Sequence, residues 1–140
     1  MRRGNGKTWL LIFCLLFQLS INFGCQRHIR RKITDKELSV IVESCSEQVY
    51  PVSLYYLDGD CSFCLAKAKE FDEKKFLKGA RSLILFKVSN PLVAKMYIQE
   101  ISLRSCVILD SSNLFAKSFA LNSMYEISEK GEIFSERADK

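Results

Sequence analysis

The chain has 140 residues, of which 48% are hydrophobic, with only 2 Pro and 6 Gly. This composition excludes a disordered or repeat protein and predicts one globular domain with a core. The net charge is +5, and three of the basic residues lie in the first 24 positions. The only later basic cluster, residues 27–32, has no interleaved aromatic residues. We therefore expect no nucleic-acid partner.

Residues 1–24 read as a bacterial export signal. Arg2, Arg3 and Lys7 precede a run of nine apolar residues at 9–17, and polar residues follow the run. The run is shorter than the roughly 20 residues that a membrane-spanning helix needs. We therefore expect a cleaved signal peptide, with the remaining chain in the bacterial cell envelope, facing the periplasm or the exterior.

Cys25 is the candidate residue for lipid attachment. Gly24 and Cys25 resemble the lipobox of bacterial lipoproteins, in which a small residue precedes the cysteine that receives a diacylglyceryl group, although Asn22 and Phe23 depart from the usual residues there. The resemblance implies a membrane contact through a lipid anchor, with an uncleaved anchor or ordinary secretion as alternatives. Residues 25–33 would then form a lipid-anchored basic linker before the domain.

The domain at 34–140 is expected to begin with a helix. Thr34 and Glu37 have the spacing of a capping box, which marks a helix N-terminus. Apolar residues then recur at the spacing of one helical face, at Leu38, Ile41, Val42 and Cys45. We interpret Cys45 as a packing residue of that face.

Strands and helices alternate along the rest of the chain. Expected strands lie at 52–57, 82–88 and 105–110, expected helices at 61–76, 91–101 and 111–121, and a hairpin at 124–134 has Gly131 in its turn. This order predicts an α/β sandwich in which parallel strands carry helices on both faces. In the strand at 105–110, we interpret Cys106 as a small buried residue and Asp110 as a turn or cap residue.

The segment "DGDCSFC" places Cys61 and Cys64 at the start of the helix expected at 61–76. Free N–H groups at a helix N-terminus stabilise a thiolate at Cys61, and Cys64 lies one turn later on the same side. An exposed thiolate can attack a substrate disulfide, and a less exposed thiol can resolve the product. The pattern predicts a redox pair, and Asp60 should raise the pKa of Cys61 through its charge.

From about residue 50 to residue 135, this order of elements resembles the thioredoxin superfamily, particularly its envelope-tethered thiol-disulfide oxidoreductases. The resemblance implies a thioredoxin-like three-layer sandwich, truncated at the C-terminus because the chain stops at Lys140. It also implies that Cys61 is the catalytic nucleophile and Cys64 the resolving cysteine. The partners would be protein thiols or disulfides in the envelope, and no cofactor would be needed.

Several residues favour a non-catalytic reading instead. The family usually has Trp before the first cysteine and Pro before the second, where this chain has Asp60 and Phe63. A cis-Pro normally faces the cysteines just before the hairpin, but residues 120–125 contain no proline. The alternative is a degenerate thioredoxin-like lipoprotein that acts as a binding or structural module and carries an inert disulfide.

A zinc site is the third interpretation of the CxxC motif. Structural zinc takes four ligands, and here only Cys45, Cys106 and His28 could complete the set. None of these three forms a second closely spaced pair, and His28 lies in the basic linker. We therefore expect no bound metal.

Overall fold

The computed structural model describes residues 31–45 and 50–135. Within them, a single sheet of six strands has the order β1-β6-β5-β2-β3-β4. The strands are β1 (Arg31–Lys32), β2 (Val52–Asp58), β3 (Ser82–Lys87), β4 (Cys106–Asp110), β5 (Ser123–Ile127) and β6 (Glu132–Ser135). The helices are α2 (Asp35–Ser44), α3 (Ser62–Leu77), α4 (Pro91–Ile101) and the short 3₁₀ helix η1 (Leu114–Lys117). Cys25 and His28 lie outside the described residues.

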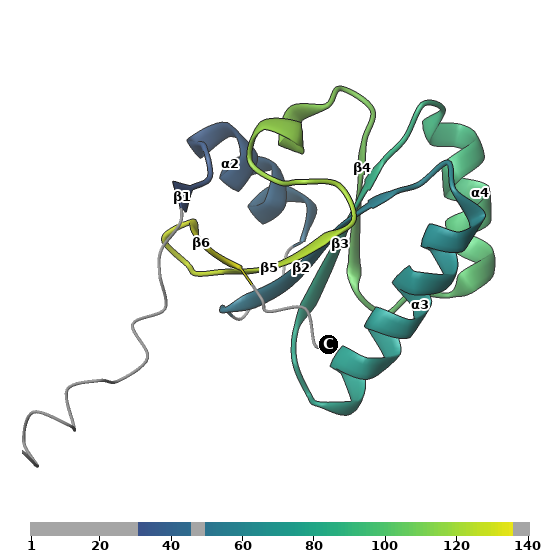
Figure 1. The fold of residues 1–140 in the computed structure, drawn as a ribbon, viewed down its shortest axis with the longest axis horizontal. Helices are drawn as coiled ribbons and strands as arrows, with labels where there is room; N and C mark the ends of the chain where they lie inside the picture. Colours follow the sequence, from purple (N-terminus) through teal and green to yellow (C-terminus); the bar gives the residue numbers. More distant parts are fainter. Residues whose placement is uncertain (1–30, 46–49, 136–140) are drawn as a thin grey trace, which may run out of the picture.

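The sheet topology confirms the expected α/β sandwich. Strands β2, β3 and β4 are parallel neighbours, whereas β5 pairs antiparallel with both β2 and β6. Helices α3 and α4 cover one face of the sheet, and α2 with η1 covers the other (Figure 1). The result is the three-layer arrangement that the alternation of strands and helices predicted.

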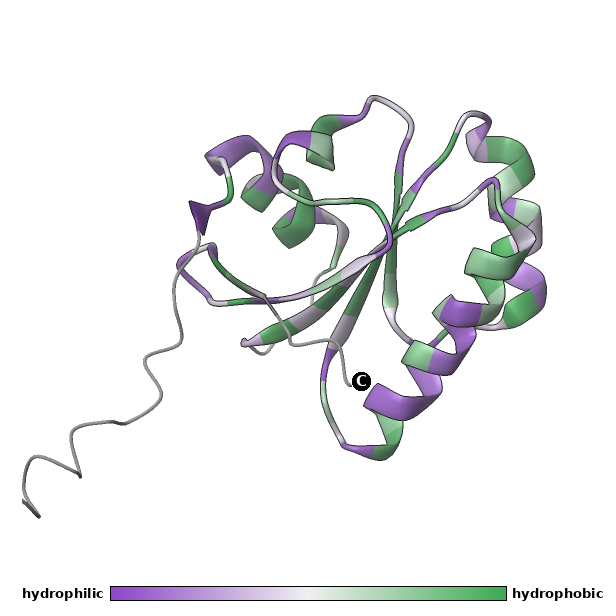
Figure 2. Ribbon diagram, in the orientation of Figure 1, coloured by the Kyte–Doolittle hydropathy of each residue, from purple (hydrophilic) through white to green (hydrophobic). Residues whose placement is uncertain are grey.

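Strand β3 contributes side chains to both cores. Its four residues from Leu83 to Phe86 are fully buried, as the continuous apolar run predicted. Because side chains alternate across a strand, Leu83 and Leu85 join the core under α2 and η1, and Ile84 and Phe86 join the core under α3 and α4. The strands that carry both cores are mostly hydrophobic in Figure 2.

The first helix starts where the sequence predicted. The Thr34 hydroxyl accepts a hydrogen bond from the Glu37 N–H at 3.2 Å, and Glu37 Oε2 accepts one from the Thr34 N–H at 2.7 Å. Both halves of the capping box are therefore present. Glu37 Oε2 also accepts a hydrogen bond from Ser118, which ties α2 to the end of η1.

Two elements differ from expectation. Arg31 and Lys32 pair with β6 as the edge strand β1, although both residues fall within the range expected as linker. The helix expected at 111–121 shortens to η1, whose first N–H groups, at Leu114 and Phe115, donate to the buried carboxylate of Asp110. Asp110 therefore has the capping role that the sequence predicted.

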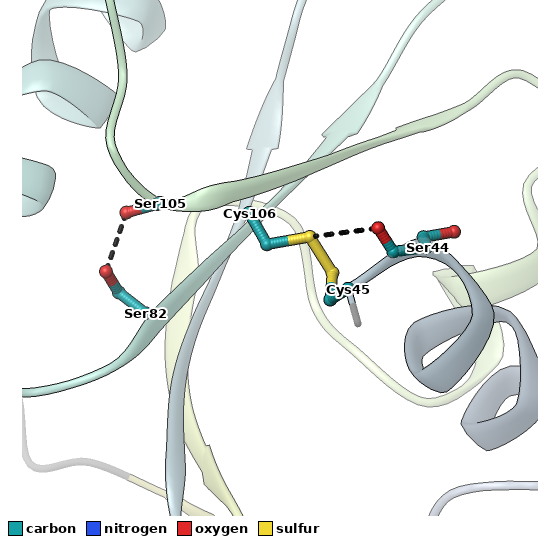
Figure 3. The surroundings of a disulfide bond; sticks show 5 residues. All are labelled: Ser44, Cys45, Ser82, Ser105 and Cys106. Atoms are coloured by element: carbon teal, nitrogen blue, oxygen red, sulfur yellow. Dashed lines mark hydrogen bonds between the residues drawn. A yellow bond between two sulfur atoms is a disulfide. The ribbon is translucent and has the colours of Figure 1, made fainter. Parts of the chain in front are cut away.

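Cys45 packs in the core as predicted, whereas Cys106 is only partly buried, and the two form a disulfide that the sequence analysis did not predict (Figure 3). Cys45 is buried at the end of α2, and Cys106 begins β4, with their Cα atoms 5.9 Å apart. The packing of α2 over the sheet brings these residues together from positions 61 apart in sequence. Sequence periodicity located Cys45 on the inner face but could not identify the residue that it meets there.

Candidate redox site

The CxxC motif begins in a tight turn at the carboxyl end of β2. Gly59 lies so close to the end of β3 that an added Cβ would be 2.6 Å from Cγ1 of Val88. The Gly59 N–H donates to the carbonyl of Lys87 at 2.8 Å, which holds the turn against that strand. A residue without a side chain is therefore required here, directly before the helix that carries the cysteines.

The two acidic residues of the turn have different roles. Asp58 Oδ1 accepts a hydrogen bond from the Asp60 N–H, and Asp60 Oδ2 accepts one from the Ser89 N–H at 2.9 Å. Hydrogen bonding to Ser89 lowers the pKa of Asp60. We expected the charge of Asp60 to raise the pKa of Cys61. The carboxylate with that effect is instead Asp58, because Asp60 is turned toward Ser89.

Cys61 occupies the N-cap position of α3 and is partly exposed. Its pKa is lowered, first by the hydrogen bond from the Cys64 thiol and next by the N–H of Cys64, with a further contribution from the N–H of Phe63. The first turn of the helix therefore stabilises the thiolate, as the position of the motif predicted.

Cys64 has the opposite properties. Its side chain is only 6% exposed and packs in the core under α3 and α4. Burial raises its pKa, and the hydrogen bond to Cys61 raises it further. Both cysteines are free thiols in this structure. As the pH rises, Cys61 therefore ionises first, and Cys64 is still protonated when Cys61 has become a thiolate.

The helix that carries both cysteines is fixed to the sheet by a buried carboxylate. Asp72 of α3 accepts hydrogen bonds from the N–H groups of Arg104 and Ser105, in the connection between α4 and β4. The Ser105 hydroxyl also bonds to Asp72. Because these partners lie close to the first residue of β4, α3 has a defined position over the sheet.

Sequence reasoning missed one side chain that contacts the pair. Asn122, directly before β5, has its carboxamide Oδ1 3.6 Å from the Cys64 thiol, within hydrogen-bonding distance of a sulfur donor. Its backbone is left-handed, with φ 59°. The sequence did show that this loop lacks a proline, but it gave no sign of which side chain would face the cysteines.

Exposed apolar side chains lie within the motif and on α4. Phe63, between the two cysteines, is 66% exposed, and a groove of about 340 Å³ lies between the turn and α4, with Asp60, Ser62 and Tyr97 among its lining residues. The exposed apolar residues on α4 are Leu92, Val93, Met96 and Tyr97. Val93 and Tyr97 therefore line the same groove as Asp60 and Ser62, the residues on either side of Cys61.

The disulfide also bears on the zinc interpretation. Cys45 and Cys106 are bonded to each other, so their sulfurs are not available as thiolate ligands for a site built on the CxxC motif. Among residues 31–45 and 50–135, no three His, Cys, Asp or Glu side chains are grouped as metal ligands would be. In the same residues, no helix has the length and apolar character needed to cross a membrane.

Solved structures of other proteins share the sheet and helix arrangement of this chain. No protein-family model and no curated protein sequence matches this chain. A secreted disulfide oxidoreductase of Mycobacterium tuberculosis, homologous to Escherichia coli DsbE, superimposes with a TM-score of 0.50 at 14% identity, over 64% of this chain and 70% of its own. The thioredoxin domain of a thiol-disulfide oxidoreductase from Bacteroides vulgatus gives a TM-score of 0.49 at 17% identity, over 63% and 71% of the two chains. The chain has a thioredoxin-like fold.

Proposed function

We propose that the protein is a thiol-disulfide oxidoreductase of the bacterial cell envelope. The observation that carries the proposal is the asymmetry of the CxxC pair: Cys61 is partly exposed with a lowered pKa, and Cys64 is buried with a raised pKa. A pair of this kind can separate the attacking role from the resolving role. The substrates would be protein thiols or disulfides, and the reaction needs no cofactor.

Two exchange steps follow from this assignment. In the reducing direction, the Cys61 thiolate attacks one sulfur of a substrate disulfide, the substrate S–S bond breaks, and the other substrate sulfur leaves as a thiolate. Cys64 then loses its proton and attacks Cys61 Sγ. The mixed disulfide breaks, the second substrate sulfur takes up a proton, and Cys61 and Cys64 are left as a disulfide. Oxidation of a substrate dithiol is the same sequence in reverse.

The disulfide between Cys45 and Cys106 supports the envelope location. Disulfides form and persist in exported proteins and are rare in the cytosol of most bacteria. This agrees with the export signal expected at residues 1–24.

The redox potential of the Cys61 and Cys64 pair tests the proposed function. We expect a value between about −270 and −120 mV, the range of catalytic pairs, whereas structural disulfides lie below about −300 mV. The protein would be equilibrated with glutathione or dithiothreitol buffers, and the peptide that contains both cysteines would be quantified by mass spectrometry. Following this peptide alone separates the pair from the second disulfide. A potential below about −300 mV would contradict the proposal.

A non-catalytic module is the second candidate function, and the loop before β5 favours it. Asn122 has a positive φ that proline cannot adopt, so the loop differs in backbone conformation from one that carries a proline at this position. Asp60 and Phe63 also replace the residues usual beside the cysteines. In this case the pair would be an inert disulfide with a potential in the structural range.

We also propose that Cys25 carries a lipid that anchors the domain to the membrane. Cys25 is the only cysteine that follows a small residue at the end of the expected leader. Mass spectrometry of the mature N-terminus should show a chain that begins at Cys25 with a diacylglyceryl group. A mature chain that begins elsewhere, or one that retains residues 1–24, would exclude this anchor.

A further inference from the structure

We propose that Asn122 positions Cys64 for the step in which Cys64 resolves the mixed disulfide. The inference rests on the redox role proposed above and adds a residue to it. Asn122 acts through Cys64 and forms no bond with the substrate.

The backbone fixes Asn122 against the strand that leads to the cysteines. The Asn122 N–H donates to the carbonyl of Tyr56 in β2 at 2.7 Å, and the next residue, Ser123, pairs with Tyr56 in the sheet. Asparagine is among the few residues other than glycine that tolerate a left-handed backbone, here with φ 59°. This conformation places the carboxamide beside Cys64 Sγ, at 3.6 Å.

The contact matters most after the first exchange step. In the reduced protein, Cys64 donates a hydrogen bond to the Cys61 thiolate, which is the largest cause of the lowered pKa of Cys61. Once Cys61 is in a mixed disulfide, its sulfur is no longer an anion and loses its strength as an acceptor. The single hydrogen of the Cys64 thiol is then donated to the Asn122 carboxamide oxygen, 3.6 Å away, so the buried thiol is held beside the bond that it must attack.

A carboxamide suits both states of Cys64. Its oxygen accepts from the thiol, and its NH₂ group can donate to the thiolate after rotation of the side chain. The step itself is balanced: Cys64 gives up its proton, its thiolate bonds to Cys61 Sγ, and the departing substrate sulfur leaves with the electron pair and takes up a proton. A carboxylate at position 122 could only accept, and its charge would oppose the thiolate.

Two substitutions separate these effects. Asn122→Gly removes the side chain but keeps the left-handed backbone, because glycine adopts positive φ without strain. Asn122→Asp keeps the shape of the side chain but replaces its donor group with a negative charge. Thermal unfolding would verify that each full-length variant is folded.

The probe is the aromatic disulfide dithiobis(nitrobenzoate), which releases one coloured thiolate when Cys61 attacks and a second when Cys64 resolves the product. The rate of the second release is followed against pH. In the Cys64→Ser variant, Cys61 should release one coloured thiolate, and the second release should be absent. A variant with both Cys61→Ser and Cys64→Ser gives the background from the remaining cysteines.

For Asn122→Gly we expect the plateau rate of the second release at high pH to fall about threefold, the effect of losing one weak hydrogen bond. For Asn122→Asp we expect the midpoint of the pH profile to rise by about one unit, which slows the second release about tenfold at pH 7. A residue that only shapes the turn would not move the midpoint. An unchanged plateau in the Gly variant together with an unchanged midpoint in the Asp variant would overturn the inference.

A last measurement separates this inference from the proposed function. In a Cys61→Ser background no exchange can occur, but alkylation of Cys64 by iodoacetamide still reports its ionisation. Adding Asn122→Asp should slow this alkylation about tenfold near pH 8. Equal rates would refute the contact between Asn122 and Cys64, even if the pair proves redox-active. A slower rate would support the contact even if the redox potential of the pair refutes the oxidoreductase.

Discussion

A Cys64→Ser variant is expected to accumulate disulfide-linked complexes through Cys61. Cys61 keeps the N–H groups of the first turn of α3, which stabilise its thiolate, so the first exchange step still occurs. Without the Cys64 sulfur, the mixed disulfide is not resolved within the molecule. The complexes would be isolated from cells after alkylation of free thiols and separated on non-reducing gels, and a reductant should release the partners.

The Cys61→Ser variant is the matched control, and we expect almost no complexes with it. Cys64 is buried and its pKa is raised, so it is a poor nucleophile toward a protein disulfide. Similar yields of complexes from both variants would reject the assigned order of attack. An absence of complexes from both would favour the non-catalytic module.

Loss of the Cys45 to Cys106 disulfide should cause the largest change in stability. The bond closes a loop across 61 positions of the chain, so removing it should lower the free energy of unfolding by about 4 kcal/mol, because the unfolded chain regains conformational freedom. Cys45→Ala combined with Cys106→Ala would be compared with the unsubstituted protein by urea denaturation. Alanine is chosen because Cys45 is buried among apolar side chains.

A second double variant controls for the loss of two sulfur atoms. Cys61→Ala combined with Cys64→Ala removes the same groups from a pair that is not cross-linked in this structure. It should be destabilised much less, because it affects packing at Cys64 alone and opens no loop. Equal losses in the two double variants would mean that the Cys45 to Cys106 cross-link does not stabilise the fold.

Local sequence patterns predicted much of this fold. The capping box at Thr34 and the apolar run at 82–88 identified a helix start and a doubly buried strand, because both signals depend on residues close together in sequence. The position of the cysteines at the start of α3 was predicted in the same way, from a turn between a strand and a helix.

The features that could not be predicted depend on distant residues. The disulfide joins the end of α2 to the start of β4, and Asn122 meets Cys64 from a loop 58 positions further along the chain. The two-residue strand β1 exists only because β6 offers a free edge to pair with. No local pattern specifies such contacts, because they arise only once the sheet has formed.

The two cysteine pairs lie at opposite ends of the sheet. Cys61 follows the carboxyl end of β2, whereas Cys106 begins the parallel strand β4, next to Leu83 at the amino end of β3. A strand of this length spans roughly 17 Å, and thiols exchange only when their sulfurs touch. Within one molecule, Cys61 and Cys64 therefore cannot exchange with the Cys45 to Cys106 disulfide. The proposed catalytic cycle would leave that disulfide oxidised throughout.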